Sequence, residues 1–130
     1  TRWPAKSPPV RLVWDHLSWD HTGERVASLM DTMLRDFTNL YMSLKLSLDD
    51  SLESTYILDA NGDIKTEWLA LFNKYPDRIL IGADQFFVPP GASGVGPDLF
   101  GETWQVVAKL PGNLAHKIST ENPRTLYNLD

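Results

Sequence analysis

The sequence predicts an α/β protein with a small parallel sheet, because segments of two hydrophobic periods alternate along the chain. Short apolar runs typical of strands cover residues 10–14, 39–46 and 78–83. Segments whose apolar residues recur every three or four positions, the spacing of an amphipathic helix, follow these runs. This alternation is typical of consecutive βα units. The length of 130 residues corresponds to one domain.

Each element follows from its residue types. Residues 1–9 hold three prolines and are expected to form a linker or loop. After the first strand and the polar loop 15–23, a helix is expected over 24–37. One face of this helix carries Val26, Leu29, Met30, Met33, Leu34 and Phe37.

The second half of the chain repeats the pattern. The strand 39–46 leads into an acidic loop over 47–62 that ends in an Asn-Gly turn. A helix follows and ends before Pro76, because proline disfavours helical backbone in the residue before it. After the strand 78–83 comes a Gly/Pro-rich loop, and the chain ends in one or two helices separated near Pro111. Trp68 and Trp104 fall at helical core spacings and are expected to pack inside.

Composition excludes several classes of function. Twelve basic and seventeen acidic residues give a net charge of −5, which argues against a nucleic-acid partner. No apolar stretch is long enough to span a membrane, so no membrane partner is expected. The chain has no cysteine, which excludes disulfides and thiolate chemistry. We expect a small-molecule substrate and a cytoplasmic location.

The ends of the three predicted strands each carry a titratable group. In parallel α/β folds, functional sites gather at the carboxyl ends of strands. These ends offer His16, Lys45 and Asp84. Since side chains alternate along a strand, Lys45 should share a face with Ser43, and His16 with Trp14. The polar side chains at the three strand ends are therefore expected to converge on one site at this edge of the sheet.

These residue types suit hydrolytic chemistry at a metal. Asp84 can ligate a divalent cation or act as a base, and His16 can ligate or deprotonate water. Lys45 suits an anionic substrate group, and Trp14 and Trp19 can wall an aromatic pocket. Structural alternatives stay open: a turn acid for Asp84, a hydrogen-bonded loop residue for His16, and a solvated or ion-paired Lys45.

Two local motifs carry less weight. The stretch DHLSWDH (15–21) is dense in ligand-type residues, but its histidines are five positions apart in a loop. We expect Asp20 and His21 to cap the following helix or lie on the rim rather than to form a separate metal site. The stretch GASGVG (91–96) lacks the lysine of a phosphate-binding loop and is expected to be a mobile lid.

Four stretches together resemble a known family. VRLVWDHLSW, NLYMSLKL, WLALFNKYPDRILIGADQFF and LPGNLAHKISTENPRTLY resemble the last third of the amidohydrolase-related metal-dependent hydrolases, of the amidohydrolase 2 type. The resemblance covers roughly residues 9–128, and its most specific piece is RILIGAD after KYPD. It implies a (β/α)8 TIM barrel whose sixth, seventh and eighth strands are the three found here.

The resemblance also implies roles for single residues. Asp84 matches the acid after the eighth strand, which ligates the metal or handles the proton of the attacking water. His16 matches the histidine after the sixth strand, near the metal and this water. Asn122 matches a structural asparagine before the final turn. Family members hydrolyse amides, esters or lactones, some decarboxylate aromatic acids, and the metal is commonly zinc.

The chain departs from the family pattern in three places. The His-x-His of the first strand and the histidine of the fifth strand are absent, and His-Leu-Ser stands in place of His-x-Gly. Three or more protein ligands are usual for catalytic zinc, whereas this chain has at most two. The sequence begins at Thr1, and we expect residues 1–130 to be the C-terminal portion of a longer barrel, inactive alone.

An alternative of another class is a non-catalytic α/β module, binding or structural, without a metal. The 130 residues alone favour this alternative, because they lack the remaining ligands. A cut barrel would expose the edges of its outer strands, so a homo-oligomer is expected in that case.

Overall fold

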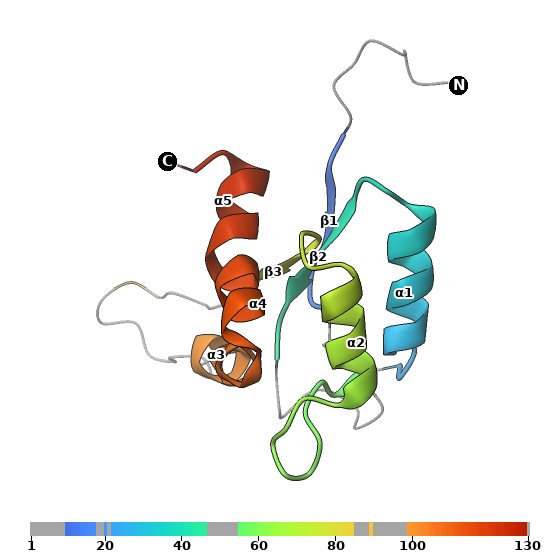
Figure 1. Cartoon of the computed structure of the whole chain (residues 1–130), viewed down its shortest axis with the longest axis vertical. Coiled ribbons are helices and arrows are strands. Elements are labelled where there is room, and N and C mark those ends of the chain that lie inside the picture. Colours follow the sequence, from blue (N-terminus) through green and yellow to red (C-terminus); the bar gives the residue numbers. More distant parts are fainter. Residues whose placement is uncertain are drawn as a thin grey trace.

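The computed structural model describes residues 10–17, 20, 22–46, 55–84, 89 and 99–129. The elements are β1 (Leu12–Trp14), α1 (Ala27–Asp36), β2 (Leu40–Leu44), α2 (Thr66–Lys74), β3 (Ile79–Ile81), α3 (Leu99–Lys109), α4 (Gly112–His116), the π-helix η2 (Lys117–Glu121) and α5 (Asn122–Tyr127). They form an α/β protein in which strands and helices alternate from β1 to α3 (Figure 1). The predicted α/β class, the parallel sheet and the alternation of strands with helices are confirmed, and the predicted strands extend further than the observed ones.

The three strands form one parallel sheet in the order β1-β2-β3. Trp14 is level with Met42, and Met42 is level with Ile79. Residues that are level in neighbouring parallel strands point to the same face. One face of the sheet therefore carries Trp14, Met42 and Ile79, and the other carries the alternate residues of each strand.

The first of these faces is packed on the helices. Met42, Leu44 and Ile79 are fully buried in the hydrophobic core, as expected from the alternation. Helices α1 and α2 lie side by side in Figure 1. The core also includes Ala27, Met30 and Leu34 of α1. From the rest of the chain it includes Trp68, Leu71, Phe72, Val106, Val107, Leu110, Leu114 and Ile118. This packing fixes where the strand ends lie.

The helical end of the chain is broken at Pro111, as predicted, and then continues through η2 into α5. Asn122 lies at the junction, 7% exposed, and its Nδ2 donates to the carbonyls of Pro76 at 2.7 Å and Ile79 at 2.5 Å. These bonds agree with the structural role that the resemblance implied. At the far end, Arg11 Nη1 donates to the carbonyls of Thr125 and Leu126, each at 3.2 Å.

The two tryptophans expected in the core differ. Trp68 is 1% exposed and packs there. Trp104 is 44% exposed and stacks on Phe100, with ring centroids 5.8 Å apart, so its prediction as a core residue is wrong. Within the described part of the chain, no helix has both the length and the apolar character needed to cross a membrane.

Candidate functional site

The ends of β1, β2 and β3 bring His16, Lys45 and Asp84 together. Asp84 Oδ2 lies 3.3 Å from His16 Nε2 and 2.9 Å from Lys45 Nζ. Lys45, from the central strand, is 4% exposed, whereas the His16 and Asp84 side chains are 26% and 38% exposed. The expected convergence of the polar strand ends is confirmed.

The backbone at His16 explains how its imidazole reaches this side of the sheet. Strict alternation from Trp14 would send His16 to the core face and Leu17 away from it. Instead, His16 has a φ of 66°, Leu17 is buried in the core, and the Leu17 N–H donates to the Ser43 carbonyl at 2.8 Å. One left-handed residue thus reverses the alternation and leaves His16 beside Asp84.

Asp84 has the same unusual backbone, with a φ of 55°. Non-glycine residues rarely adopt positive φ, and those that do cluster at functional sites. Within the described ranges, three non-glycine residues have positive φ, and two of them are His16 and Asp84. The third, Asn128, follows the end of α5. The coincidence supports a functional use of the strand ends.

The three groups shift one another's protonation. The hydrogen bond from Lys45 holds the pKa of Asp84 below its ordinary value, so Asp84 is a carboxylate at neutral pH. Burial lowers the pKa of His16, and the nearby Lys45 charge lowers it further, against the opposing effect of Asp84. The site therefore presents a neutral imidazole beside a carboxylate.

A small pocket of about 170 Å³ opens beside this cluster. It is lined by Asp15, His16, Ser43, Leu80, Ile81, Gly82, Asp84 and Tyr127. Ser43 Oγ donates to Asp15 Oδ1 at 2.7 Å, which fixes a second carboxylate at the edge. Tyr127 comes from α5 and was not among the sequence candidates, because no local pattern shows that the last helix reaches the strand ends.

Of the two tryptophans expected to wall the pocket, Trp14 does not line it. Trp14 is level with Met42 and packs against the core, so the predictions that it shares a face with His16 and walls the pocket are wrong. The guanidinium of Arg25 lies 5.3 Å from its ring centroid. Arg25 also donates to the His16 carbonyl at 2.7 Å, which steadies the turn. Trp19, the other candidate, lies outside the described residues, as does the predicted lid over 91–96.

Asp20 supports the loop rather than a metal. Its carboxylate accepts hydrogen bonds from the backbone N–H groups of Thr22, Glu24 and Arg25, just before α1. Burial alone would raise the pKa of Asp20, but these bonds hold it well below its ordinary value. The expected capping role of Asp20 agrees with these contacts, although the bonds end before the first residue of α1.

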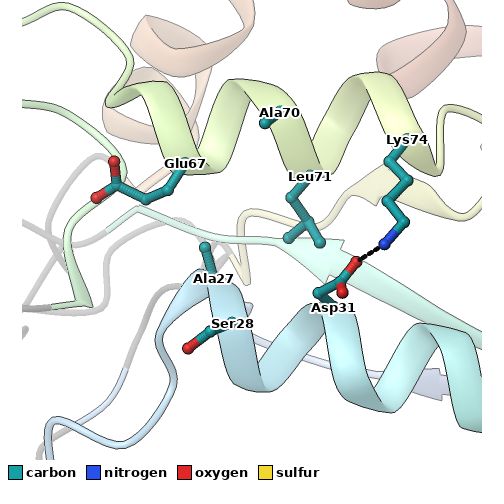
Figure 2. Close-up of a pocket in the computed structure, with 7 residues that line it drawn as sticks. All are labelled: Ala27, Ser28, Asp31, Glu67, Ala70, Leu71 and Lys74. Atoms are coloured by element: carbon teal, nitrogen blue, oxygen red, sulfur yellow. Dashed lines mark hydrogen bonds and ion pairs between the residues drawn. The ribbon is translucent and has the colours of Figure 1, made fainter.

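A larger groove lies between α1 and α2, with a volume of about 330 Å³ (Figure 2). Ala27, Ala70 and Leu71 supply apolar surface, and Lys74 and Asp31 form an ion pair across one end. Two similar helices with small facing residues explain this groove by packing alone. Its titratable groups are not gathered around one point as they are at the strand ends.

The site has two donors that fit a metal. A tetrahedral zinc centre with bonds of about 2.0–2.1 Å places two ligand atoms about 3.3–3.4 Å apart. His16 Nε2 and Asp84 Oδ2 are 3.3 Å apart, so they fit adjacent positions of such a centre. Across the parts of residues 10–129 that the structure describes, no group of three or more ligand-type side chains could hold an ion. Further ligands would have to come from other residues.

Comparisons with protein-family models, with curated proteins and with solved structures found no match to this chain. The function proposed next therefore depends on the geometry of the strand ends and on the sequence resemblance. Both concern the same residues, His16 and Asp84.

Proposed function

We propose that this chain is the C-terminal part of a barrel hydrolase that uses a divalent metal, zinc by preference, to cleave an amide, ester or lactone. The observation that carries the proposal is the contact of His16 Nε2 with Asp84 Oδ2 at the ends of the two outer strands. Three consecutive parallel strands in sequential order support a piece of a barrel.

The protonation states of Asp84 and His16 suit them to different roles. When bound, the metal would polarise the scissile carbonyl and lower the pKa of a water. Asp84 stays ionised and is suited to holding the cation. His16, kept neutral by burial and by Lys45, offers an unprotonated nitrogen that can ligate or take the proton of the water. The pocket of about 170 Å³ suits only the reacting part of a small substrate.

Decarboxylation of a small acid remains the second reaction that the resemblance implies. It would use the same metal-holding residues, and it needs a positive group for the substrate carboxylate. Lys45 is paired with Asp84 and nearly buried, so it is poorly placed to bind a substrate carboxylate. This arrangement favours hydrolysis over decarboxylation as the first proposal.

The alternative without a metal is a non-catalytic module. The observation that favours it is that the described residues contribute two metal donors rather than three. In such a module, His16, Lys45 and Asp84 would serve as a structural ion-pair cluster. Cation binding separates the two proposals.

The test is an NMR titration of the whole chain with zinc, following the imidazole signals of its three histidines. We expect a saturable shift confined to His16, abolished in Asp84→Asn. His116→Ala is the matched control, because that side chain is 62% exposed and lies in α4. No shift of the His16 signals with zinc, or the same His16 response in Asp84→Asn, would exclude the metal proposal and favour the module.

A further inference from the structure

The two outer strands of the sheet differ in what covers their outer edges. The Arg78 carbonyl accepts from the Met42 N–H at 2.9 Å, so the backbone groups of Ile79 point away from β2. The Ile79 carbonyl accepts from Asn122 Nδ2 at the start of α5, and Ile79 is fully buried. A covered edge does not pair with further strands. The outer edge of β3 is therefore closed by the C-terminal part of this chain.

The outer edge of β1 is open among the residues that the structure describes. The Leu12 N–H donates to the Asn39 carbonyl at 3.0 Å, so the backbone groups of Leu12 face β2. These groups alternate in direction along a strand, so those of Val13 face outward. No described strand pairs with this side of β1, which ends the sheet. An edge of this kind is a template for another strand.

Exposed apolar side chains lie along this edge. Leu12 is 50% exposed, and Val10, just before the strand, is 48% exposed. Tyr127, 53% exposed, lies near the other end of β1, because it lines the pocket together with Asp15. Apolar surface beside an open edge favours association, because pairing removes this surface from water.

The sequence of β1 complements itself when two copies run in opposite directions. In an antiparallel pair centred on Val13, Arg11 lies opposite Asp15 of the second copy, and Leu12 lies opposite Trp14. Side chains alternate along a strand, so Arg11 and Asp15 lie on the same face of the joined sheet. Opposite charges directly across an antiparallel pair stabilise it, and two-fold symmetry produces this contact twice. The register centred on Val13 is the one that brings these charges together.

Contacts within the chain orient both charges without neutralising them. Arg11 Nη1 donates to the carbonyls of Thr125 and Leu126, each at 3.2 Å, and Asp15 Oδ1 accepts from Ser43 Oγ at 2.7 Å. Carbonyl and hydroxyl groups carry no net charge. The guanidinium and the carboxylate are thus held at opposite ends of β1, and both residues are exposed.

We propose that two copies of this chain associate through β1, antiparallel and centred on Val13, so that their sheets join into one. The occupant of the edge is a second copy because the charges of the strand complement themselves. The inference goes beyond the proposed function and needs no metal. In a complete barrel the preceding strand would pair with this edge, and in the 130-residue chain the second copy takes its place.

Single cysteines test the register, because the chain has none of its own. Val13→Cys places two thiols opposite each other at the centre, where Cα atoms about 4.5–5.5 Å apart allow a disulfide. Leu12→Cys is the matched control on the same strand. Its two copies would be displaced by two residues and lie about 8 Å apart, too far for a disulfide.

We expect sedimentation equilibrium of the wild type to show a dimer. Val13→Cys should oxidise to a covalent dimer about tenfold or more faster than Leu12→Cys, because thiols held together in a dimer meet at a high effective concentration. A wild type that stays monomeric at millimolar concentration would overturn the inference. Equal oxidation rates in the two variants would overturn the proposed register.

Charge reversal tests the two ion pairs. Arg11→Glu and Asp15→Lys each place like charges opposite one another, so each variant alone should dimerise about tenfold more weakly. Mixed in equal amounts, the two variants carry opposite charges across both contacts and should dimerise as the wild type does. Asp36→Lys is the matched control, because it reverses a charge that is 51% exposed at the end of α1 and should leave the dimer unchanged.

Circular dichroism establishes that each charge variant is folded. Folded variants that fail to dimerise when mixed would overturn the ion pairs and with them the register. The cysteine comparison keeps Arg11 and its contacts to α5, so it decides the case if Arg11→Glu does not fold.

Discussion

Replacing Gly82 with alanine should destabilise the protein, because Ser43 already fills the space that the methyl group needs. An ideal Cβ at position 82 would lie 2.7 Å from Ser43 Cβ and 2.8 Å from its Oγ. Ser43 is 3% exposed, and the Gly82 N–H donates to the Leu44 carbonyl at 2.9 Å. Neither the side chain nor the strand can move aside without losing contacts.

The magnitude follows from three contributions. Overpacking a filled site costs about 1–3 kcal/mol, and loss of the bond from Ser43 to Asp15 would add about 1 kcal/mol. Replacing glycine at an unstrained position restricts the unfolded chain, which stabilises by about 0.4–1 kcal/mol. The steric contribution is the larger, so we expect a net loss of about 1–3 kcal/mol.

Urea unfolding followed by tryptophan fluorescence measures this loss. Gly112→Ala is the control, because a Cβ there would meet no atom within 4 Å, and its stability should equal or exceed that of the wild type. In a Ser43→Gly background the nearest remaining atom is Cα, 3.7 Å away, so Gly82→Ala should cost nothing further. Equal behaviour of Gly82→Ala and Gly112→Ala, or no relief by Ser43→Gly, would refute the reasoning.

Changes at buried polar contacts give three more expectations. Asp20→Ala removes the acceptor of four hydrogen bonds and should cost about 1–3 kcal/mol in urea unfolding at pH 7. Because folding lowers the pKa of Asp20, the wild type should lose this contribution as the pH falls below the ordinary value of 3.8, and the variant should not. Asn122→Ala removes the side-chain donor to the carbonyls of Pro76 and Ile79 and should also cost about 1–3 kcal/mol, with faster hydrogen exchange in β3. Asp84→Asn should destabilise more than Lys45→Met in the same unfolding assay. The first removes the carboxylate from beside an ammonium that is 4% exposed, whereas the second leaves a carboxylate that is 38% exposed.

Each of these expectations has an outcome that contradicts it. The loop role of Asp20 fails if the acid transition has the same midpoint with and without that carboxylate. Unchanged exchange in β3 would exclude the bridging role of Asn122. Equal losses for Asp84→Asn and Lys45→Met would mean that the burial of the ammonium does not control the energy of the pair.

Side-chain alternation predicted correctly those parts of the site that follow regular strands. Met42 and Leu44 face the core, whereas Ser43 lines the pocket and Lys45 contacts Asp84, because β2 stays extended to its end. Asp84 lies three residues beyond the end of β3, at the carboxyl end of the sheet where the sequence predicted it. The approach of Lys45 to Asp84 could therefore be expected from the sequence, although the ion pair itself could not.

The rest could not be predicted because it depends on one backbone angle and on distant contacts. The left-handed residue His16 reverses the alternation after Trp14, and a histidine, unlike a glycine, gives no sign of such a conformation. Tyr127 reaches the pocket only because α5 docks beside β3. Helical spacing placed Trp104 on an apolar face, but it does not say whether another element covers that face.

The hydrogen bonds from Arg11 to the last turn of α5 have a consequence for the order in which the chain folds. These contacts join Arg11 to residues that lie 114 and 115 positions further along the chain. Closing a loop of that length costs about 4 kcal/mol of chain entropy, against about 3 kcal/mol for the 28-residue separation of Ser43 and Asp15. Contacts between distant residues also slow folding. We therefore expect the strands and α1 to associate early and α5 to dock late, so that Tyr127 completes the pocket in the last step of folding.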